Sequence, residues 1–338
     1  MKTLILGGTV FLSYAVAQEA VGRGHDVTCL ARAESATPPP GARLVRANRD
    51  DGPSSYGQLA GDWDEVVEVS WNPRHVREAL EVLAQRASHW TYVSSCSVYA
   101  DNAGGPLDET ADTLGALGDG VEASLAMYGE VKVACEDMCL AVLSSRLHIC
   151  RPGLIGGPGD PSDRFGYWPA RFARFSNDDV LVPDSPDAVT ATIDVRDLAA
   201  WIVTASERGL SGTMNVLGEE RLLSDVLSLA QRAGGHRGAL VALDEDWLVD
   251  HGVAPWSGEQ SLPLWIPRSF GFEVFARRSS AHALARGLVR RPIEETIEAT
   301  LRSERFAGLN RVRAAGLSPT RESELLLEWS TSHDQGHF

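Results

Sequence analysis

The sequence predicts an α/β fold: a doubly wound parallel sheet with a smaller, mostly helical C-terminal substrate lobe. Two observations carry this prediction. First, the short apolar run at residues 3–6 leads directly into Gly7 and Gly8, and an apolar helical pattern follows over residues 10–21, so a buried strand, a tight turn and a helix succeed one another. Second, strand-like and helix-like segments keep alternating through the first half of the chain, which is typical of parallel sheets with helices on both faces.

The elements of this sheet follow one another at short intervals. We expect further strands at residues 26–31, 42–46, 65–69 and 89–94, and a helix over residues 73–87. Ligands of such sheets bind at the carboxyl ends of the strands, where the strand order reverses. The residues that directly follow each strand are therefore the candidate site residues.

Composition limits the classes of partner. The 338 residues suffice for a large core and a second lobe, and 31 basic against 46 acidic residues give a formal charge of -15, which disfavours a nucleic-acid backbone as a partner. No run approaches the ~18–20 apolar residues of a membrane span, and the first apolar run is too short for a signal peptide. We expect a soluble, cytoplasmic protein that acts on a small molecule, with no nucleic-acid or membrane partner.

The five cysteines are few and scattered for a chain of this length. Their odd number argues against a disulfide framework. Cys135 and Cys139 lie four residues apart and could be half of a metal site, but no second pair accompanies them. We expect buried thiols and no metal.

The turn after the first strand fits a dinucleotide pyrophosphate. Gly7 and Gly8 allow the backbone to approach closely, and the following helix presents its N-terminal N–H groups. In the G-x-x-G-x-x-G frame, however, Val10 and Ser13 replace the later glycines. A β-branched valine narrows the approach, so the sequence leaves open whether cofactor binding is weakened, and an ordinary strand, turn and helix without a nucleotide is the alternative.

Arg32 follows the second strand, where an NAD site usually places an acidic residue for the ribose 2′-hydroxyl. A cation there suits a 2′-phosphate. We therefore predict NADP in preference to NAD, with NAD still possible and a solvated surface arginine as the alternative.

Tyr128 and Lys132 lie four residues apart in a predicted helix, so their side chains share a face. An ammonium beside a phenol lowers the pKa of that phenol, and a phenol so placed can transfer the proton that accompanies hydride transfer at a carbonyl. A serine at the end of the fifth strand can hold the same oxygen. A lone Y-x-x-x-K pattern arises often by chance, so the interpretation depends on the other motifs.

Together the motifs resemble the extended short-chain dehydrogenase/reductase family, of the NAD-dependent epimerase/dehydratase type. The resemblance rests on the glycine turn, S-S-C-S-V-Y at residues 94–99, Y-G-E-V-K at 128–132 with Glu136, R-P-G-L-I-G-G-P-G at 151–159, I-D-V-R-D-L-A at 193–199 and G-T-M-N-V at 212–216. It implies a Rossmann-type dinucleotide-binding domain of residues 1–152 plus about 185–225. The substrate-binding cap lobe is then formed by residues 153–184 plus about 226–338.

The resemblance also implies residue roles. Ser95, Tyr128 and Lys132 are the catalytic set, and Ser94 is an alternative to Ser95, as is Ser97. The implied cofactor-binding residues are Gly7, Gly8, Thr9, Val10, Phe11, Leu12, Arg32, Asn48, Asp50, Ser70, Lys132, Pro152, Gly153 and Leu154. The expected substrate contacts are Trp71, Ser97, Tyr99, Arg164 and Trp168, although Arg164 and Trp168 could equally belong to the core of the cap.

Three functions remain open from the sequence. The first is an NAD(P)-dependent oxidoreductase that transfers hydride at a carbonyl, imine or secondary alcohol carbon. The second is a redox-neutral epimerase or dehydratase acting on a sugar nucleotide or a similar substrate, although Cys96 and Ser97 replace the acidic pair of a dehydratase. The third is a non-catalytic dinucleotide-binding protein. The resemblance further implies a homodimer formed through the helix of Tyr128, and no motif identifies the substrate.

Overall fold

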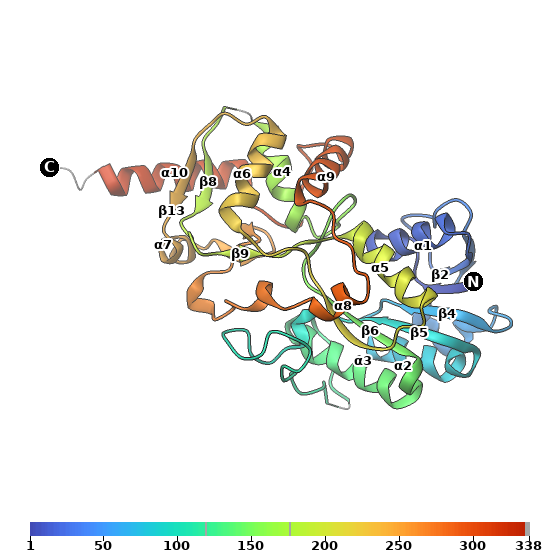
Figure 1. The fold of residues 1–338 in the computed structure, drawn as a ribbon. Helices are drawn as coiled ribbons and strands as arrows, with labels where there is room; N and C mark the ends of the chain where they lie inside the picture. Colours follow the sequence, from blue (N-terminus) through green and yellow to red (C-terminus); the bar gives the residue numbers. More distant parts are fainter. Residues whose placement is uncertain (119, 176, 335–338) are drawn as a thin grey trace. The chain divides into compact units, whose positions relative to one another are not determined.

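A computed structural model describes residues 1–118, 120–175 and 177–334 (Figure 1). The chain divides into two compact units. The first comprises Met1–Leu154, Val195–Gly218 and Arg278–Arg290, and the second Ile155–Asp194, Glu219–Arg277 and Arg291–Phe338. The segment 278–290, which we expected in the cap lobe, is thus part of the first unit.

The first unit is built on a seven-stranded parallel sheet in the order β11-β6-β5-β4-β1-β2-β3. Its strands are β1 (Lys2–Leu6), β2 (Asp26–Ala31), β3 (Arg43–Arg46), β4 (Trp63–Glu68), β5 (Ala87–Val93), β6 (Leu147–Pro152) and β11 (Gly212–Val216). The strand order reverses at β1, whose neighbours are β2 and β4. This reversal is where doubly wound sheets bind ligands, and it confirms the predicted Rossmann-type fold.

Helices cover both faces of this sheet. Helices α1 (Phe11–Gly22) and α5 (Val195–Glu207) pack together on one face, and α2 (Pro73–Leu83) packs with α3 (Tyr128–Leu143) on the other (Figure 1). The short helix α8 (Ala281–Ala285) packs against β11. Two layers of helices enclose the strands, which explains why the strands carry nearly continuous apolar runs.

The core beneath α2 and α3 follows from helical spacing. The buried face of α2 consists of Val76, Ala79, Leu80 and Leu83, and it meets Trp90 and Tyr92 of β5 in one apolar cluster. Complete burial of each large apolar side chain contributes about 1.5–3 kcal/mol. These contacts hold the carboxyl ends of β4 and β5 in place beside α3.

The predicted helix over residues 73–87 ends earlier than expected. Helix α2 stops at Leu83, a 3-10 turn spans Ala84–Arg86, and Ala87 already belongs to β5. Ala87 is the β-sheet partner of Trp63 in β4. Sheet pairing therefore overrides the local helix propensity of this segment.

The second unit is mostly helical, with short pairs of strands. Its helices are α4 (Arg164–Arg174), α6 (Leu223–Gly234), α7 (Glu245–Asp250), α9 (Ile293–Ala307) and α10 (Pro319–Asp334). Its strand pairs are β7 (Ile155–Gly156) with β10 (Ile193–Asp194), β8 (Val180–Pro183) with β13 (Leu240–Leu243), β9 (Val189–Thr190) with β12 (Arg221–Leu222), and β14 (Ala254–Trp256) with β15 (Ser261–Pro263). Helix α4 packs against α6 and α9, which gives this unit its own core.

The described residues contain neither a membrane-spanning helix nor a cluster of metal ligands. Among the described residues, no helix has the length and apolar character needed to cross a membrane. Within the same residues no group of three or more His, Cys, Asp and Glu side chains could hold a metal ion. All five cysteines are buried and free, and burial raises the pKa of the Cys29 thiol to about 12.

Candidate active site

A cavity of about 250 Å³ opens at the carboxyl ends of β1, β2 and β3. We call it the β1–β3 cavity. Six of the residues that we assigned to the cofactor line it, namely Gly7, Thr9, Val10, Arg32, Asn48 and Asp50. Arg49 and His75, which we did not predict, line it as well. The first unit therefore has a concave site where a doubly wound sheet binds nucleotides.

The glycine turn is required by its packing. Gly7 and Gly8 have φ values of 135° and 97°, which residues with a Cβ rarely adopt. A Cβ on Gly8 would also lie 2.3 Å from the sulfur of Cys29 in β2. The turn thus packs directly on the neighbouring strand, and only glycine allows this.

The start of α1 leaves amide groups for a ligand. The first amide bonded to the carbonyl of Val10 is that of Tyr14, at 3.3 Å. The amides of residues 11–13 precede it, as the first N–H groups of any helix do. Together with the positive end of the helix dipole they suit an anionic group such as a pyrophosphate.

The two glycine replacements are accommodated by the turn. Val10 is the N-cap of α1 with an extended backbone (φ -134°, ψ 135°), a conformation open to any residue, and its side chain is 48% exposed. Ser13 is buried and donates a hydrogen bond to the Val10 carbonyl at 2.9 Å. The residue between them, Phe11, has a φ of 42°, so backbone strain lies at this turn.

The rim of the cavity carries both signs of charge. The exposed guanidinium of Arg32 lies 3.8 Å from the carboxylate of Glu34. Asp50 accepts hydrogen bonds from His75 at 2.8 Å and from Arg74 at 3.3 Å. The bond from His75, with the charges of Arg74 and Arg32, holds the pKa of Asp50 below its ordinary value. A ribose hydroxyl and a phosphate would both find partners on this rim.

Tyr128 begins α3, and Lys132 lies one helical turn further along it. The Lys132 ammonium lies 5.9 Å from the centroid of the Tyr128 ring. Lys132 is 2% exposed, and its ammonium donates to the carbonyls of Ser70 at 3.2 Å and Val93 at 2.7 Å. An ammonium has three N–H donors, so these two bonds orient the group and leave a third donor for a ligand oxygen.

The scarcity of lysine in this chain is a second sequence signal for Lys132. Of the 31 basic residues only two, Lys2 and Lys132, are lysines, and all others are arginines. A chance Y-x-x-x-K pattern is therefore much rarer in this chain than in an ordinary one. A lysine retained in an arginine-rich chain indicates a role that arginine cannot fill.

The serine turn lies beside the start of α3. Ser95 is the N-cap of a 3-10 turn over Cys96–Val98, and its hydroxyl accepts from the Ser97 amide at 3.1 Å and donates to the Ser97 hydroxyl at 3.1 Å. A Cβ on Gly129 would lie 2.4 Å from the Ser97 carbonyl oxygen. The turn is therefore packed against the residue next to Tyr128. Burial raises the pKa of the intervening Cys96 thiol to about 12, which makes it a poor nucleophile.

The segment after β4 completes this constellation. The Trp71 ring lies 6.2 Å from the Tyr128 ring between centroids, and Trp71 is 37% exposed. Ser70 precedes it and presents its carbonyl to Lys132. Two residues that we assigned to cofactor and substrate thus lie next to the predicted catalytic pair.

Tyr99 and Trp168 have environments that do not support the predicted substrate contacts. Tyr99 is 1% exposed and its hydroxyl donates to Asn215 at 2.6 Å. Trp168, in the second unit, is also 1% exposed, donates to the Pro263 carbonyl at 2.7 Å and stacks on Phe172. Both rings are therefore enclosed by protein, and the polar atom of each has its hydrogen-bond partner inside the core.

The remaining assignments stay predictions. Pro152 ends β6, and the Gly153 amide donates to the Val216 carbonyl at 3.2 Å, while Leu154 is buried. Arg164 belongs to the second unit, where its guanidinium lies 5.2 Å from the Trp256 ring centroid.

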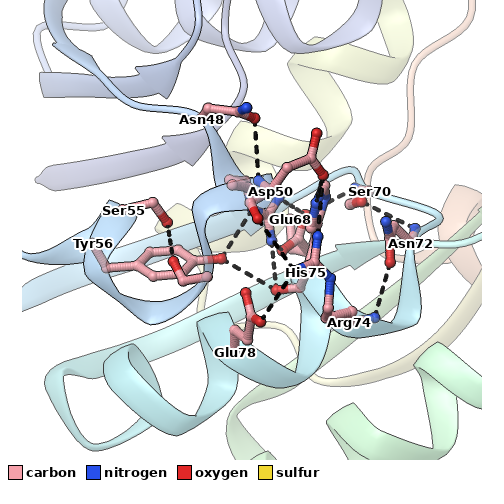
Figure 2. A network of polar contacts seen from close by, with 12 residues as sticks. Asn48, Asp50, Ser55, Tyr56, Glu68, Ser70, Asn72, Arg74, His75 and Glu78 are labelled. Atoms are coloured by element: carbon pink, nitrogen blue, oxygen red, sulfur yellow. Dashed lines mark hydrogen bonds and ion pairs between the residues drawn. The ribbon is translucent and has the colours of Figure 1, made fainter.

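Arg49 and Glu68 are the polar residues that sequence reasoning missed. Glu68 is the last residue of β4 and is fully buried. Both of its oxygens accept from Arg49, at 2.9 and 2.5 Å. Figure 2 shows Glu68 within this network of polar contacts. The available signal was an acidic residue at the carboxyl end of an apolar strand, which is where this fold places its ligands.

Residues 65–218 match the model of the NAD dependent epimerase/dehydratase family. The matched region contains Tyr128, Lys132 and the serine turn, so the resemblance seen in the motifs is confirmed. A search of curated proteins by sequence gave no match.

Solved structures share the fold of this chain. The UDP-glucuronic acid 4-epimerase from Bacillus cereus, in complex with NAD, has a TM-score of 0.62 at 16% identity, over 91% of this chain and 99% of that one. The UDP-glucose 4-epimerase from Thermus thermophilus, in complex with NAD, has a TM-score of 0.61 at 17% identity, over 91% and 100%. The structure of gox2253 has a TM-score of 0.66 at 19% identity, over 92% and 99%. Sequence identities this low show a shared fold and nothing more.

Proposed function

We propose that this chain is an NAD-dependent enzyme that oxidises a secondary alcohol carbon of a sugar nucleotide and reduces it again within one turnover. The net reaction is a redox-neutral epimerisation. The observation that carries the proposal is the meeting of Lys132, Tyr128 and the Ser95 turn at the carboxyl edge of the sheet. The family match and the sugar-nucleotide epimerases among the structural neighbours favour this function over the net oxidoreductase that the sequence analysis put first.

The residues around the β1–β3 cavity fit a dinucleotide. The Gly7–Gly8 turn and the open amides of α1 suit the pyrophosphate, and Asp50 on the cavity rim suits hydroxyl or amine donors of an adenosine. The third donor of Lys132 suits the second ribose. When bound, NAD⁺ would accept a hydride from the substrate carbon and give it back.

Side chains of this protein would transfer the proton of the substrate hydroxyl. The Tyr128 oxygen takes the proton of the substrate hydroxyl as the C–H bond breaks, which leaves a ketone, and returns that proton when the carbon is reduced from its other face. The Ser95 hydroxyl holds the substrate oxygen, and the Lys132 ammonium stabilises the ionised phenol. Cys96 and Ser97 follow Ser95 in place of an acidic pair, so no carboxylate is available there for elimination. This favours epimerisation over dehydration.

A second candidate function is a net NADP-linked oxidoreductase. Arg32 on the rim of the β1–β3 cavity favours it, because a guanidinium suits a 2′-phosphate. The two candidates differ in whether the cofactor is regenerated in each turnover.

The experiment that tests the proposal uses the full-length protein without added cofactor. Nucleotide released on denaturation is identified by chromatography, and UDP-glucose and UDP-glucuronic acid are each followed by proton NMR. We expect NAD in the released fraction and the C4 epimer in the reaction, with a loss of about 10²–10⁴-fold in the Tyr128→Phe variant. Conversion only with stoichiometric NADPH would support the second candidate. Absence of conversion and of binding to either cofactor would contradict both.

A further inference from the structure

We propose that Glu68 is a positioning residue for Lys132. Its carboxylate, held by Arg49, fixes the backbone of Ser70, and the Ser70 carbonyl in turn holds the Lys132 ammonium. The catalytic meaning of this arrangement rests on the proposed function, because that function makes Lys132 catalytic. The contacts themselves do not depend on it.

Glu68 is rigidly held. Arg49 binds both of its carboxylate oxygens, and the same guanidinium donates to the His75 carbonyl at 2.7 Å and to the Tyr56 hydroxyl at 3.0 Å. Burial alone would lower the pKa of Arg49, but the charge of Glu68 and the hydrogen bonds to it raise that pKa. The Arg49 guanidinium therefore stays charged, and its bonds to α2 and to the segment after β3 fix it against Glu68.

The Glu68 carboxylate in turn holds the backbone of Ser70. The Ser70 amide donates to Glu68 at 2.8 Å, and the Ser70 hydroxyl accepts from the Asn72 amide at 3.0 Å (Figure 2). The Tyr92 hydroxyl donates to the Ser70 carbonyl at 3.2 Å. These bonds set the direction in which the carbonyl of Ser70 points.

The two carbonyls that accept from Lys132 are held in different ways. Val93 is the last residue of β5, so the sheet itself holds its carbonyl. Strand β4 ends at Glu68, so Ser70 lies beyond the ladder and sheet pairing does not hold it. The carboxylate of Glu68 supplies the missing anchor. Without it, the backbone of Ser70 loses the bond that fixes its amide, and the Tyr92 hydroxyl is left to hold the carbonyl that orients the ammonium.

A role in stability alone explains this pair less well. Buried ion pairs often contribute little net stability compared with apolar residues of the same size, since both charges lose their hydration. Glu68 also does more than pair with Arg49, because its carboxylate accepts the Ser70 amide. Arg49 moreover lines the β1–β3 cavity, so one ion pair joins the cavity wall to the support of Lys132.

The chain offers a direct readout of this support. Lys2 and Lys132 are the only lysines in the sequence, so reductive methylation with ¹³C-formaldehyde labels two side chains and the terminal amine. Lys2, whose ammonium donates to the Ala60 carbonyl at 3.3 Å at the surface, is the internal reference. The labelling rate of Lys132 relative to Lys2 reports how firmly the Lys132 ammonium is held, and it requires neither substrate nor cofactor.

The matched variants are Glu68→Gln and Glu65→Gln in the full-length protein. Glu65 lies on the same strand, is also fully buried, and pairs with His89 instead. We expect Lys132 to react about tenfold faster in Glu68→Gln, the effect of about one hydrogen bond to a charged group, and at an unchanged rate in Glu65→Gln. Thermal unfolding of both variants shows whether their losses of stability are comparable. An unchanged Lys132 rate in Glu68→Gln, or an equal increase in Glu65→Gln, overturns the proposal.

A second variant covers the case in which Glu68→Gln does not fold. Arg49→Lys keeps the charge but loses the bidentate hydrogen bonds to the carboxylate. We expect a smaller increase, about threefold, in the rate at which Lys132 is methylated. An unchanged rate in this variant also counts against the proposal. Where the wild-type protein epimerises a sugar nucleotide, the turnover number of Glu68→Gln should fall about tenfold with an unchanged KM. Where it does not, the labelling result still decides the role of Glu68, so the two failures are distinguishable.

Discussion

The carbonyl of Ser97 lies so close to Gly129 that a Cβ on that glycine would come within 2.4 Å of the oxygen. This contact joins the turn that carries Ser95 to the first turn of α3, where Tyr128 begins the helix. The segments that carry the Ser95 and Tyr128 hydroxyl groups are therefore packed against each other at this glycine.

Replacing Gly129 by alanine should separate these groups. The added methyl must displace backbone, which costs about 1–3 kcal/mol of unfolding free energy, and misplacement of the serine turn by about 1 Å should reduce turnover about 100-fold. Urea unfolding and the epimerase assay measure the two effects. Gly115→Ala is the control, because a Cβ at Gly115 would meet nothing within 4 Å. Full activity of Gly129→Ala would show that the close contact is not needed.

Lys132 should not be replaceable by arginine, although the rest of the chain uses arginine almost throughout. The ammonium donates to two carbonyls inside a buried site, and a planar guanidinium on a longer side chain cannot reproduce that geometry. We expect Lys132→Arg to keep its fold, as judged by circular dichroism, and to lose at least about 100-fold in turnover. Activity near that of the wild type would mean that positive charge alone suffices.

Arg32 should decide the cofactor preference of the β1–β3 cavity. Because its guanidinium is exposed and faces Glu34, Arg32→Ala should weaken NADPH binding about tenfold, the effect of one charged hydrogen bond, and leave NADH binding nearly unchanged. Glu34→Ala should strengthen NADPH binding by removing a competing carboxylate. Fluorescence titration with both nucleotides measures these changes. Equal losses for NADH and NADPH in Arg32→Ala would exclude a 2′-phosphate contact.

His148 should make the protein sensitive to acid. Burial lowers the pKa of His148 from 6.5 to about 3. Between these values the unfolded chain binds a proton that the folded chain does not, so unfolding becomes easier as the pH falls below 6.5. At pH 4 this difference corresponds to about 3 kcal/mol.

The matched variant for this prediction is His148→Phe, which keeps a ring against Trp201. Urea unfolding at pH 7 and pH 4 gives the free energy of unfolding at each pH. The wild type should lose about 3 kcal/mol more than His148→Phe between the two conditions. Parallel losses would show that His148 does not contribute to acid sensitivity.

Local patterns were sufficient for the parts of the fold that depend on neighbouring residues. The strand before Gly7, the turn and the pair of Tyr128 and Lys132 one helical turn apart are all set by spacing along the chain. The order in which the motifs follow one another then identified the family. These features are predictable because their physical causes, strand burial and helical periodicity, act over a few residues.

Contacts between distant residues were not predictable in this way. Arg49 and Glu68 are 19 positions apart, and neither position shows that its side chain will meet the other. Arg278 donates to the carbonyl of Pro106 across 172 positions, which brings the segment 278–290 into the first unit. Trp168 lies in a polar stretch typical of a binding loop, yet packing in the second unit encloses its ring. In each case tertiary packing, rather than a local pattern, decides the outcome.

The order of the strands has a consequence for how the chain is made. Strand β11 is the outer neighbour of β6, but the ribosome must first synthesise the residues between Pro152 and Val216. At about 5–20 residues per second this takes several seconds. During that interval β6, whose residues are all buried in the finished protein, forms an unpaired edge that can bind another strand. Until β11 emerges, this edge of the newly made polypeptide is therefore open to pairing with a strand of a second copy.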